Sequence, residues 1–285
     1  MPRLSRPIVV PVDTEELCIR FNAAPLSGLA GPLSGLVAPL VGQLALLGVV
    51  DLAVGLDGRG WWVGVDGALG VTILVARAQA TASMPRLGPA DRVTLTRAGL
   101  AMAVAALAAG SKSAELRPSA RALLVSVCAV ALVLDGVDGA VARRTGTATP
   151  LGARFDLEVD AFLILVLSTL VARTSGSWVL LIGTARYLFV VAGWGLPWMR
   201  RTLAPRFWRK VVAATQGVVL TAATAQVGPP WLTTLALLAA LGLLAESFGR
   251  DTWWLWVRRD PEPHPAARQV GQPDAALIPS GDGDA

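Results

Sequence analysis

Long runs of apolar residues constrain this chain more than any other feature. Several stretches of about 20 residues contain almost only hydrophobic side chains, and a helix of that length crosses a hydrocarbon core of about 30 Å. Hydrophobic residues form 54% of the 285-residue chain and charged residues only 16%, which excludes an ordinary soluble enzyme. We therefore expect an all-α integral membrane protein that crosses the bilayer several times.

The expected membrane helices form two groups, with a polar break between them at 83–91. Before the break, an apolar segment at 34–55 and a shorter, glycine-rich segment at 61–79 resemble a hydrophobic hairpin. After the break, further helices are expected at 93–110, 119–143, 151–172, 177–199, 209–227 and 231–248.

Three regions follow from this pattern. An N-terminal extension with two hydrophobic segments covers 1–82, a core of six transmembrane helices covers 83–250, and a polar tail covers 251–285. The tail is rich in Pro, Asp and Gly, so we expect it to be mostly disordered and cytoplasmic. Acidic residues precede the first apolar run, which argues against a cleaved signal peptide.

The basic residues predict the orientation of the chain. Lys and Arg number 25, and most of them fall in the alternate loops that share a side with the N-terminus. Because basic loops stay in the cytoplasm, we expect the N-terminus inside the cell and the protein in the plasma membrane. The 10 tryptophans cluster at the ends of the expected helices, as interfacial anchors do. No basic stripe interleaved with aromatic residues occurs in the sequence, so no nucleic-acid partner is expected.

Metal chemistry in this chain has to use oxygen ligands. The only histidine, His264, lies in the polar tail. Of the two cysteines, Cys18 lies in the N-terminal tail and Cys128 lies inside an apolar run, which gives neither a disulfide framework nor a thiolate metal site. Hard oxygen ligands suit Mg²⁺ or Mn²⁺, so carboxylates are the candidate ligands.

Four aspartates are placed to converge on such a site. On a helix Asp135 and Asp138 share one face, and Asp156 and Asp160 share a face of the next helix. Two antiparallel helices joined by the turn at 145–150 can bring the four carboxylates together near the cytoplasmic face. Their mutual repulsion is strong without cations, and two divalent ions offset it. Acidic residues in apolar segments are functional candidates by default.

Small residues and an arginine accompany these aspartates. Gly139 directly follows an aspartate and Gly152 lies at the start of the next helix, and both remove a side chain where a ligand has to approach closely. Arg143, at the cytoplasmic end of its helix, offers a planar pair of donors to a phosphate.

The spacing of these residues resembles the signature of the CDP-alcohol phosphotransferase family. The run is Asp135-Gly-Val-Asp138-Gly139-Ala-Val-Ala142-Arg143, then eight residues, Gly152, three residues, Asp156, three residues and Asp160. All eight fixed positions match. The resemblance covers about 83–250, where six expected spans agree with the six-helix core of that family, and it does not cover 1–82 or the tail.

The resemblance implies a role for each matching residue. It implies that Asp135, Asp138 and Asp156 are metal ligands and that Asp160 is the general base and also contacts a metal. A second set matches the CDP and diphosphate site: Gly139, Ala142, Arg143 and Gly152. A shorter pattern upstream, Asp91, Thr94 and Arg97 at three-residue steps, resembles the family's first helix and would face the nucleotide. The resemblance also implies a homodimer.

The expected activity is that of a phospholipid-synthesising transferase. The resemblance implies transfer of a phosphatidyl group from CDP-diacylglycerol to a small alcohol, with release of CMP. The first alternative is transfer of a phospho-headgroup from a CDP-alcohol to diacylglycerol. The second is a non-catalytic or transport membrane protein that retains the fold. The acceptor stays open among inositol phosphate, glycerol phosphate, phosphatidylglycerol and serine.

Three further polar residues are candidates for the acceptor site. Arg186, Lys210 and Gln216 lie in or at the start of expected spans, and they faintly resemble positions of phosphatidylglycerophosphate and cardiolipin synthases. The pattern departs from those enzymes at Tyr187, where an acidic residue is expected. Snorkelling of the side chain to the membrane surface explains Lys210 equally well.

Other polar residues have structural interpretations. Glu158 lies on the helix face opposite Asp156 and is expected to pair with Arg154, four residues before it. Gln43 and Asp51 either mark a pathway or form hydrogen bonds between helices, and no function is assigned to them.

Overall fold

The computed structural model describes residues 30–82, 89–110, 116–145, 150–200 and 207–258. Within these ranges the regular structure is entirely helical, which confirms the predicted all-α class. The long helices are α1 (Ala30–Val54), α2 (Gly58–Ala82), α3 (Pro89–Gly110), α4 (Pro118–Thr145), α5 (Pro150–Ser175), α6 (Leu180–Gly195), α7 (Phe207–Ala225) and α8 (Pro230–Val257). Two short 3₁₀ helices flank α6, namely η2 (Ser177–Val179) and η3 (Pro197–Arg200).

A helix is found at each of the segments expected from the sequence. Proline is the first residue of α3, α4, α5 and α8. A helix tolerates proline there because the amide groups of the first turn have no partner within the helix. The expected helix at 177–199 is wrong in one respect, because it is interrupted. Leu196 adopts an extended conformation with φ −123° and ψ 93°, as the residue before a proline tends to do, and η3 begins at Pro197.

Five of the described helical segments are long and apolar enough to cross a membrane. They are Gly35–Val54, Arg92–Gly110, Pro118–Gly136, Ser177–Gly195 and Pro230–Val257. The other long helices, α2, α5 and α7, contain charged residues in or beside their apolar stretches, such as Asp66, Glu158 and Lys210. The apolar helices indicate a multi-pass membrane protein, and the expected count of six spans after residue 83 stays a prediction.

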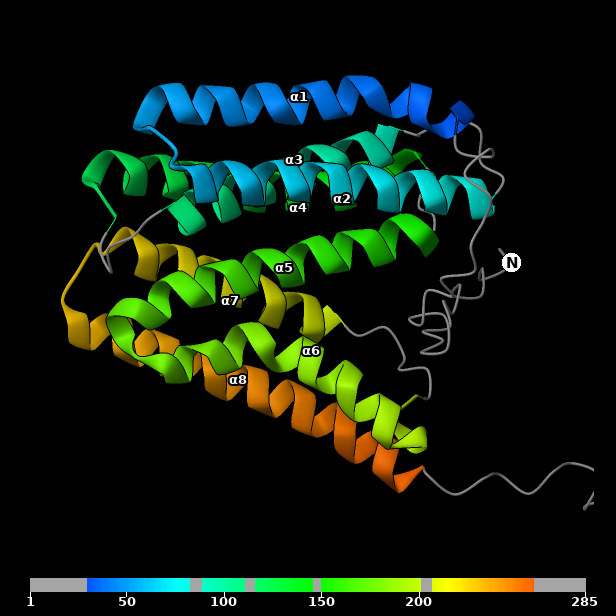
Figure 1. Ribbon diagram of the computed structural model, residues 1–285. Coiled ribbons are helices and arrows are strands. Elements are labelled where there is room, and N and C mark those ends of the chain that lie inside the picture. The colour runs from blue at the N-terminus through cyan, green and yellow to red at the C-terminus, as the bar shows by residue number, and fades with distance from the viewer. Residues whose placement is uncertain (1–29, 83–88, 111–115, 146–149, 201–206, 259–285) are drawn as a thin grey trace, which may run out of the picture.

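The helices lie side by side in one bundle, and successive long helices run in opposite directions (Figure 1). Helix α3 is at the centre, because 72% of its apolar segment is buried against 17 to 22% in the other four apolar segments. It contacts α1, α2, α4 and α5. Many of its buried residues are alanines, including Ala98, Ala101 and Ala105, which allow neighbouring helices to approach closely.

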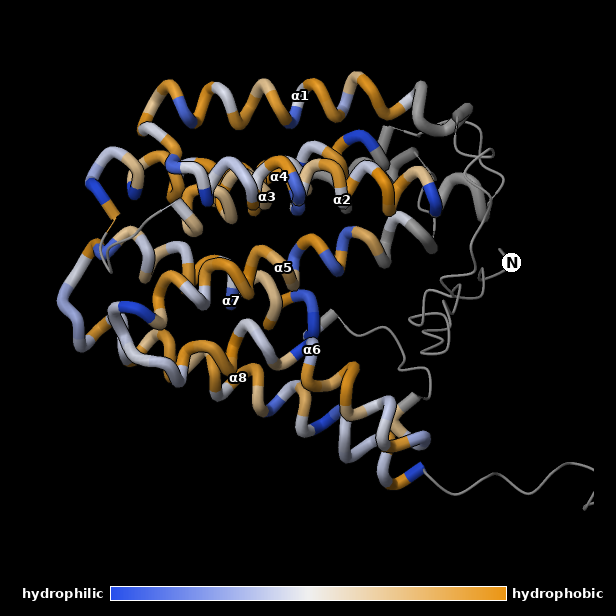
Figure 2. Tube along the Cα trace, in the orientation of Figure 1, coloured by the Kyte–Doolittle hydropathy of each residue, from blue (hydrophilic) through white to orange (hydrophobic). Residues whose placement is uncertain are grey.

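The outer surface of the bundle is apolar. Large hydrophobic side chains such as Val41, Leu52 and Leu235 are exposed, and Figure 2 shows hydrophobic residues along much of α1 and α8. Hydrocarbon solvates such a surface better than water does. Tryptophans lie near helix ends on both sides of the bundle, for example Trp62 at the start of α2 and Trp253 at the end of α8. The predicted clustering of tryptophans at helix ends is therefore confirmed.

The two N-terminal helices share a core with the rest of the bundle. Glycines of α2 face α3, so that a Cβ atom on Gly60 would lie 2.8 Å from the carbonyl oxygen of Ala106. A Cβ atom on Gly64 would lie 2.7 Å from a methyl group of Leu47 in α1. Because α1 and α2 pack this closely, they contribute to the surroundings of α3, from which the candidate site is built. The division at residue 82 stays a prediction, and the tail from residue 259 lies outside the described residues.

Candidate active site

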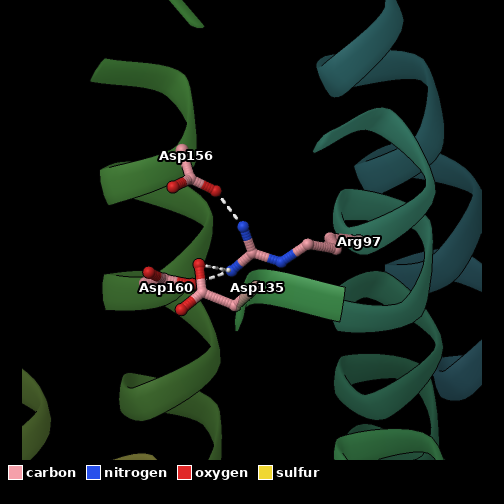
Figure 3. Close-up of polar contacts among 4 residues, drawn as sticks. All are labelled: Arg97, Asp135, Asp156 and Asp160. Atoms are coloured by element: carbon pink, nitrogen blue, oxygen red, sulfur yellow. Dashed lines mark hydrogen bonds and ion pairs between the residues drawn. The ribbon is translucent and has the colours of Figure 1, made fainter. Parts of the chain in front are cut away.

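One buried arginine and three aspartates meet between α3, α4 and α5. Arg97 extends from α3 into the space between the carboxylates, as Figure 3 shows. Its Nη2 atom lies 3.0 Å from Oδ1 of Asp135 in α4, and its two terminal nitrogens donate hydrogen bonds to Asp156 and Asp160 in α5. The Arg97 side chain is 2% exposed, whereas the three carboxylates are 29 to 39% exposed. The carboxylates therefore lie between a buried cation and an accessible surface.

Helix geometry explains why these carboxylates converge. Asp156 and Asp160 are four residues apart and point from the same face of α5. That face packs against α3, which also contacts α4 and thereby places Asp135 beside them. The predicted convergence across the α4–α5 turn is confirmed for these three aspartates. Asp138 lies three residues further along α4, and its side chain is outside the described residues.

The three aspartates are suitable ligands for a divalent cation. One oxygen of each carboxylate lies within 4.8 Å of an oxygen of both others. Oxygens that share one Mg²⁺ at about 2.1 Å are at most about 4 Å apart, so a small adjustment of the side chains is enough. Three hard, negatively charged oxygen ligands are the set that Mg²⁺ and Mn²⁺ prefer. This part of the protein can therefore bind a divalent metal.

Two other residues expected at the nucleotide site lie close to this cluster in the sequence. Thr94 is buried in α3, one turn before Arg97 and on the same face of the helix. Gly152 lies one turn before Asp156, in the first turn of α5. The side chains of the remaining expected residues lie outside the described residues: Asp91, Gly139, Ala142 and Arg143.

The residues expected at the acceptor site lie in different places. Arg186 of α6 forms an ion pair with Glu158 of α5 and lies within electrostatic range of Asp160. Lys210 is exposed in the first turn of α7. Gln216 is 1% exposed and donates a hydrogen bond of 2.8 Å to the carbonyl oxygen of Ala240, so its amide joins α7 to α8. Of these three residues, only Arg186 has a described contact with α5, the helix that carries Asp156 and Asp160.

The partner of Glu158 differs from the expected one. The sequence interpretation paired Glu158 with Arg154, whose side chain is outside the described residues, and the structure pairs it with Arg186. These two residues are 28 positions apart, so helical spacing alone gives no signal for the pair. The contact of Arg97 with the aspartates was missed for the same reason.

The polar residues of the N-terminal hairpin have structural roles. Asp51 accepts a hydrogen bond of 2.7 Å from the backbone amide of Leu56, which closes the turn between α1 and α2. Gln43 is buried, and a Cβ atom on Gly99 of α3 would lie 3.0 Å from its side chain. Of the two alternatives for these residues, a pathway or a structural role, both observations favour the structural one.

Comparisons with curated proteins and with solved structures gave no match. The family model described as CDP-alcohol phosphatidyltransferase matches residues 88–247, which is more than half of the chain. The match begins at α3 and ends within α8, so it includes Arg97 and the three aspartates of the cluster, Asp135, Asp156 and Asp160. The chain therefore belongs to the CDP-alcohol phosphatidyltransferase family.

Proposed function

We propose that this protein transfers a phosphatidyl group from CDP-diacylglycerol to a small alcohol and releases CMP. The observation that carries the proposal is the meeting of Asp135, Asp156 and Asp160 in a chain of this family. The family itself implies a transferase that acts on CDP-alcohol substrates. The direction of transfer, the lipid donor and the roles of single residues are our inference.

The aspartates would hold divalent ions, and two Mg²⁺ or Mn²⁺ ions are the proposed complement. Asp135, Asp138 and Asp156 are the proposed ligands, with Asp160 as a further contact. When bound there, such ions supply positive charge at the diphosphate of the donor.

Asp160 is the proposed general base. Its carboxylate would take the proton of the acceptor hydroxyl, while the hydroxyl oxygen forms a bond to the phosphorus atom that carries the lipid. The bond between that phosphorus and the CMP oxygen breaks as the new bond forms, so CMP leaves with the electron pair. Asp160 is 29% exposed, which leaves it accessible to an acceptor that enters from water.

The nucleotide and diphosphate would bind next to the aspartates along α3, α4 and α5. The proposed contacts are Asp91, Thr94, Arg97, Gly139, Ala142, Arg143 and Gly152. The placement of Thr94 and Gly152, each one turn from a member of the cluster, supports this arrangement.

The cluster lies in the half of the bundle where α3 and α5 begin and α4 ends (Figure 1). Described basic residues gather at this end, namely Arg77, Arg92, Arg209, Lys210, Arg250 and Arg258. The guanidinium of Arg258 also lies 4.2 Å from the ring centre of Trp254, an arrangement suited to the membrane interface. We therefore propose six catalytic spans in the plasma membrane, with the active site facing the cytoplasm. The proposed homodimer rests on the family resemblance alone.

An anionic acceptor is favoured by the surroundings of Asp160. Arg186 pairs with Glu158 on the α6 side of α5 and acts electrostatically on Asp160, so it can contact a phosphate on the acceptor. Lys210 and Gln216 complete the proposed acceptor set, although Gln216 is held by the backbone of α8.

The test is CMP release by the purified protein with CDP-diacylglycerol, Mg²⁺ or Mn²⁺ and a panel of alcohols. We expect release that depends on the metal and on one acceptor, and we expect a phosphorylated acceptor to be the best substrate. Release only with CDP-alcohols and diacylglycerol would establish the first alternative. No release with either class of donor would contradict the proposal and favour a non-catalytic or transport protein.

A further inference from the structure

The strongest unexplained contact in the bundle is that of Arg97 with the aspartates. Its guanidinium is almost completely buried, and its three acidic partners come from two other helices. Among the described residues its Nε–H has no hydrogen-bond acceptor, so one donor of the guanidinium is still unused. Packing of α3 against its neighbours therefore does not account for all the donors of this side chain.

The contact balances charges that would otherwise be unfavourable. Three carboxylates whose oxygens lie within 4.8 Å repel one another, and a buried guanidinium without acidic partners is strongly destabilising. Arg97 and the aspartates therefore stabilise each other and hold α3 against α4 and α5. The protein carries its own cation at the place where the carboxylates meet.

The same carboxylates are the candidate ligands of a divalent ion. Oδ1 of Asp135, Asp156 and Asp160 each contacts a terminal nitrogen of Arg97. An ion in contact with these oxygens would lie within a few ångströms of the guanidinium, where two positive charges repel strongly. The guanidinium has to withdraw before the carboxylates can bind the ion fully.

We propose that Arg97 is an internal counter-ion that competes with the divalent metal for the aspartates and transfers to the diphosphate of the donor. A displaced guanidinium at a buried position needs a new anion, and a diphosphate offers bidentate acceptors for its planar donors. Gly152, one turn before Asp156, has no side chain to hinder that movement. The metal displaces the guanidinium from the aspartates and the diphosphate accepts it, so the binding of either one increases the affinity for the other. The destination of the guanidinium rests on the proposed function, whereas the competition itself rests on the contacts.

Metal affinity in the full-length protein tests the competition without any turnover. Mn²⁺ binding would be measured by isothermal titration calorimetry for the wild type, Arg97→Gln, Arg97→Lys and Arg209→Gln. We expect Arg97→Gln to bind Mn²⁺ about tenfold more tightly or better, which is the usual size of such coupling. Arg97→Lys keeps the positive charge but loses the planar pair of donors. Its Mn²⁺ affinity should therefore lie between those of the wild type and Arg97→Gln. Arg209→Gln breaks an Arg–Asp pair with Asp251 outside the site and should bind like the wild type.

The same titrations in the presence of CDP test the transfer to the diphosphate. We expect CDP to increase the Mn²⁺ affinity of the wild type several-fold and to have a much smaller effect in Arg97→Gln. An equal effect of CDP in the two proteins would contradict the transfer.

Equal or weaker Mn²⁺ binding by Arg97→Gln would contradict the competition, and it would leave the proposed activity standing. Absence of Mn²⁺ binding in the wild type would overturn both proposals, because the aspartates would then not be a metal site. If Arg97→Gln does not fold in the absence of metal, Arg97→Lys decides the question, since tighter binding than wild type is required of it as well. Thermal unfolding with and without Mn²⁺ provides a second measure, in which the stabilisation by Mn²⁺ should be larger in both Arg97 variants.

Discussion

Arg186 of α6 pairs with Glu158 of α5 on the face of α5 that turns away from Asp156 and Asp160. Helix α5 therefore presents acidic residues to arginines on two sides. Arg97 holds the aspartates from the α3 side, and Arg186 holds Glu158 from the α6 side. The two pairs differ in exposure, because Arg97 is 2% exposed and Arg186 is 26% exposed. Arg186 is therefore the arginine that a water-soluble acceptor can contact more easily, while the carboxylate of Asp160 is itself 29% exposed.

This difference predicts opposite effects of two variants on acceptor binding. Arg186→Gln should raise the KM for a phosphorylated acceptor about tenfold with little change in kcat, because a charge-assisted contact to the phosphate is lost. Glu158→Gln should lower that KM, because it releases Arg186 from its partner. Steady-state kinetics at saturating donor would measure both. If the pair is only structural, both variants should lower the thermal stability slightly and leave the KM unchanged.

The packing of α2 on α3 predicts a contrast between two glycines of the same helix. Gly60→Ala should destabilise the protein by about 1–3 kcal/mol, because its Cβ would lie 2.8 Å from a backbone oxygen that cannot move away easily. Gly70→Ala, which has no atom of the described residues within 4 Å of its Cβ position, should be neutral or slightly stabilising. Thermal unfolding of the two variants in the same detergent measures the difference. Equal stabilities would show that α2 does not pack closely on α3.

Removal of divalent metal should abolish turnover. With EDTA we expect CMP release to fall to background and to return when Mg²⁺ or Mn²⁺ is added in excess. Asp135→Asn should raise the metal concentration needed for half-maximal activity by about tenfold or more, since even residues that only orient a ligand have effects of that size. Activity that persists in EDTA, or an unchanged metal requirement in Asp135→Asn, would exclude the aspartates as the site of an essential metal.

The sequence predicts the parts of this site that depend on helical spacing. The four-residue step from Asp156 to Asp160 places both carboxylates on one face, and the short connection after α4 brings Asp135 to them. The sequence does not predict which arginine faces these groups, because Arg97 is 59 and 63 residues away from its partners in α5. Glu158 shows the same limit, since a local partner at four residues is the natural expectation and the observed partner belongs to another helix.

The number of spans is harder to predict for a functional reason. Asp156, Glu158 and Asp160 make the first half of α5 polar, so the helix that carries half of the proposed catalytic aspartates is not among the apolar spans. The interruption of the expected helix at 177–199 had a visible cause in Gly195 and Pro197, two residues that favour the end of a helix.

The most direct test of the central claim is the rate of CMP release from CDP-diacylglycerol by Asp160→Asn compared with the wild type. Asp66→Asn, at an exposed position of α2, is the matched control for the change of charge. Loss of a general base lowers the rate about 10²- to 10⁴-fold, so we predict a fall of that size in Asp160→Asn, with wild-type folding and no fall in the control. Wild-type rates in Asp160→Asn under conditions where the wild type turns over would contradict the assignment of Asp160 as the base.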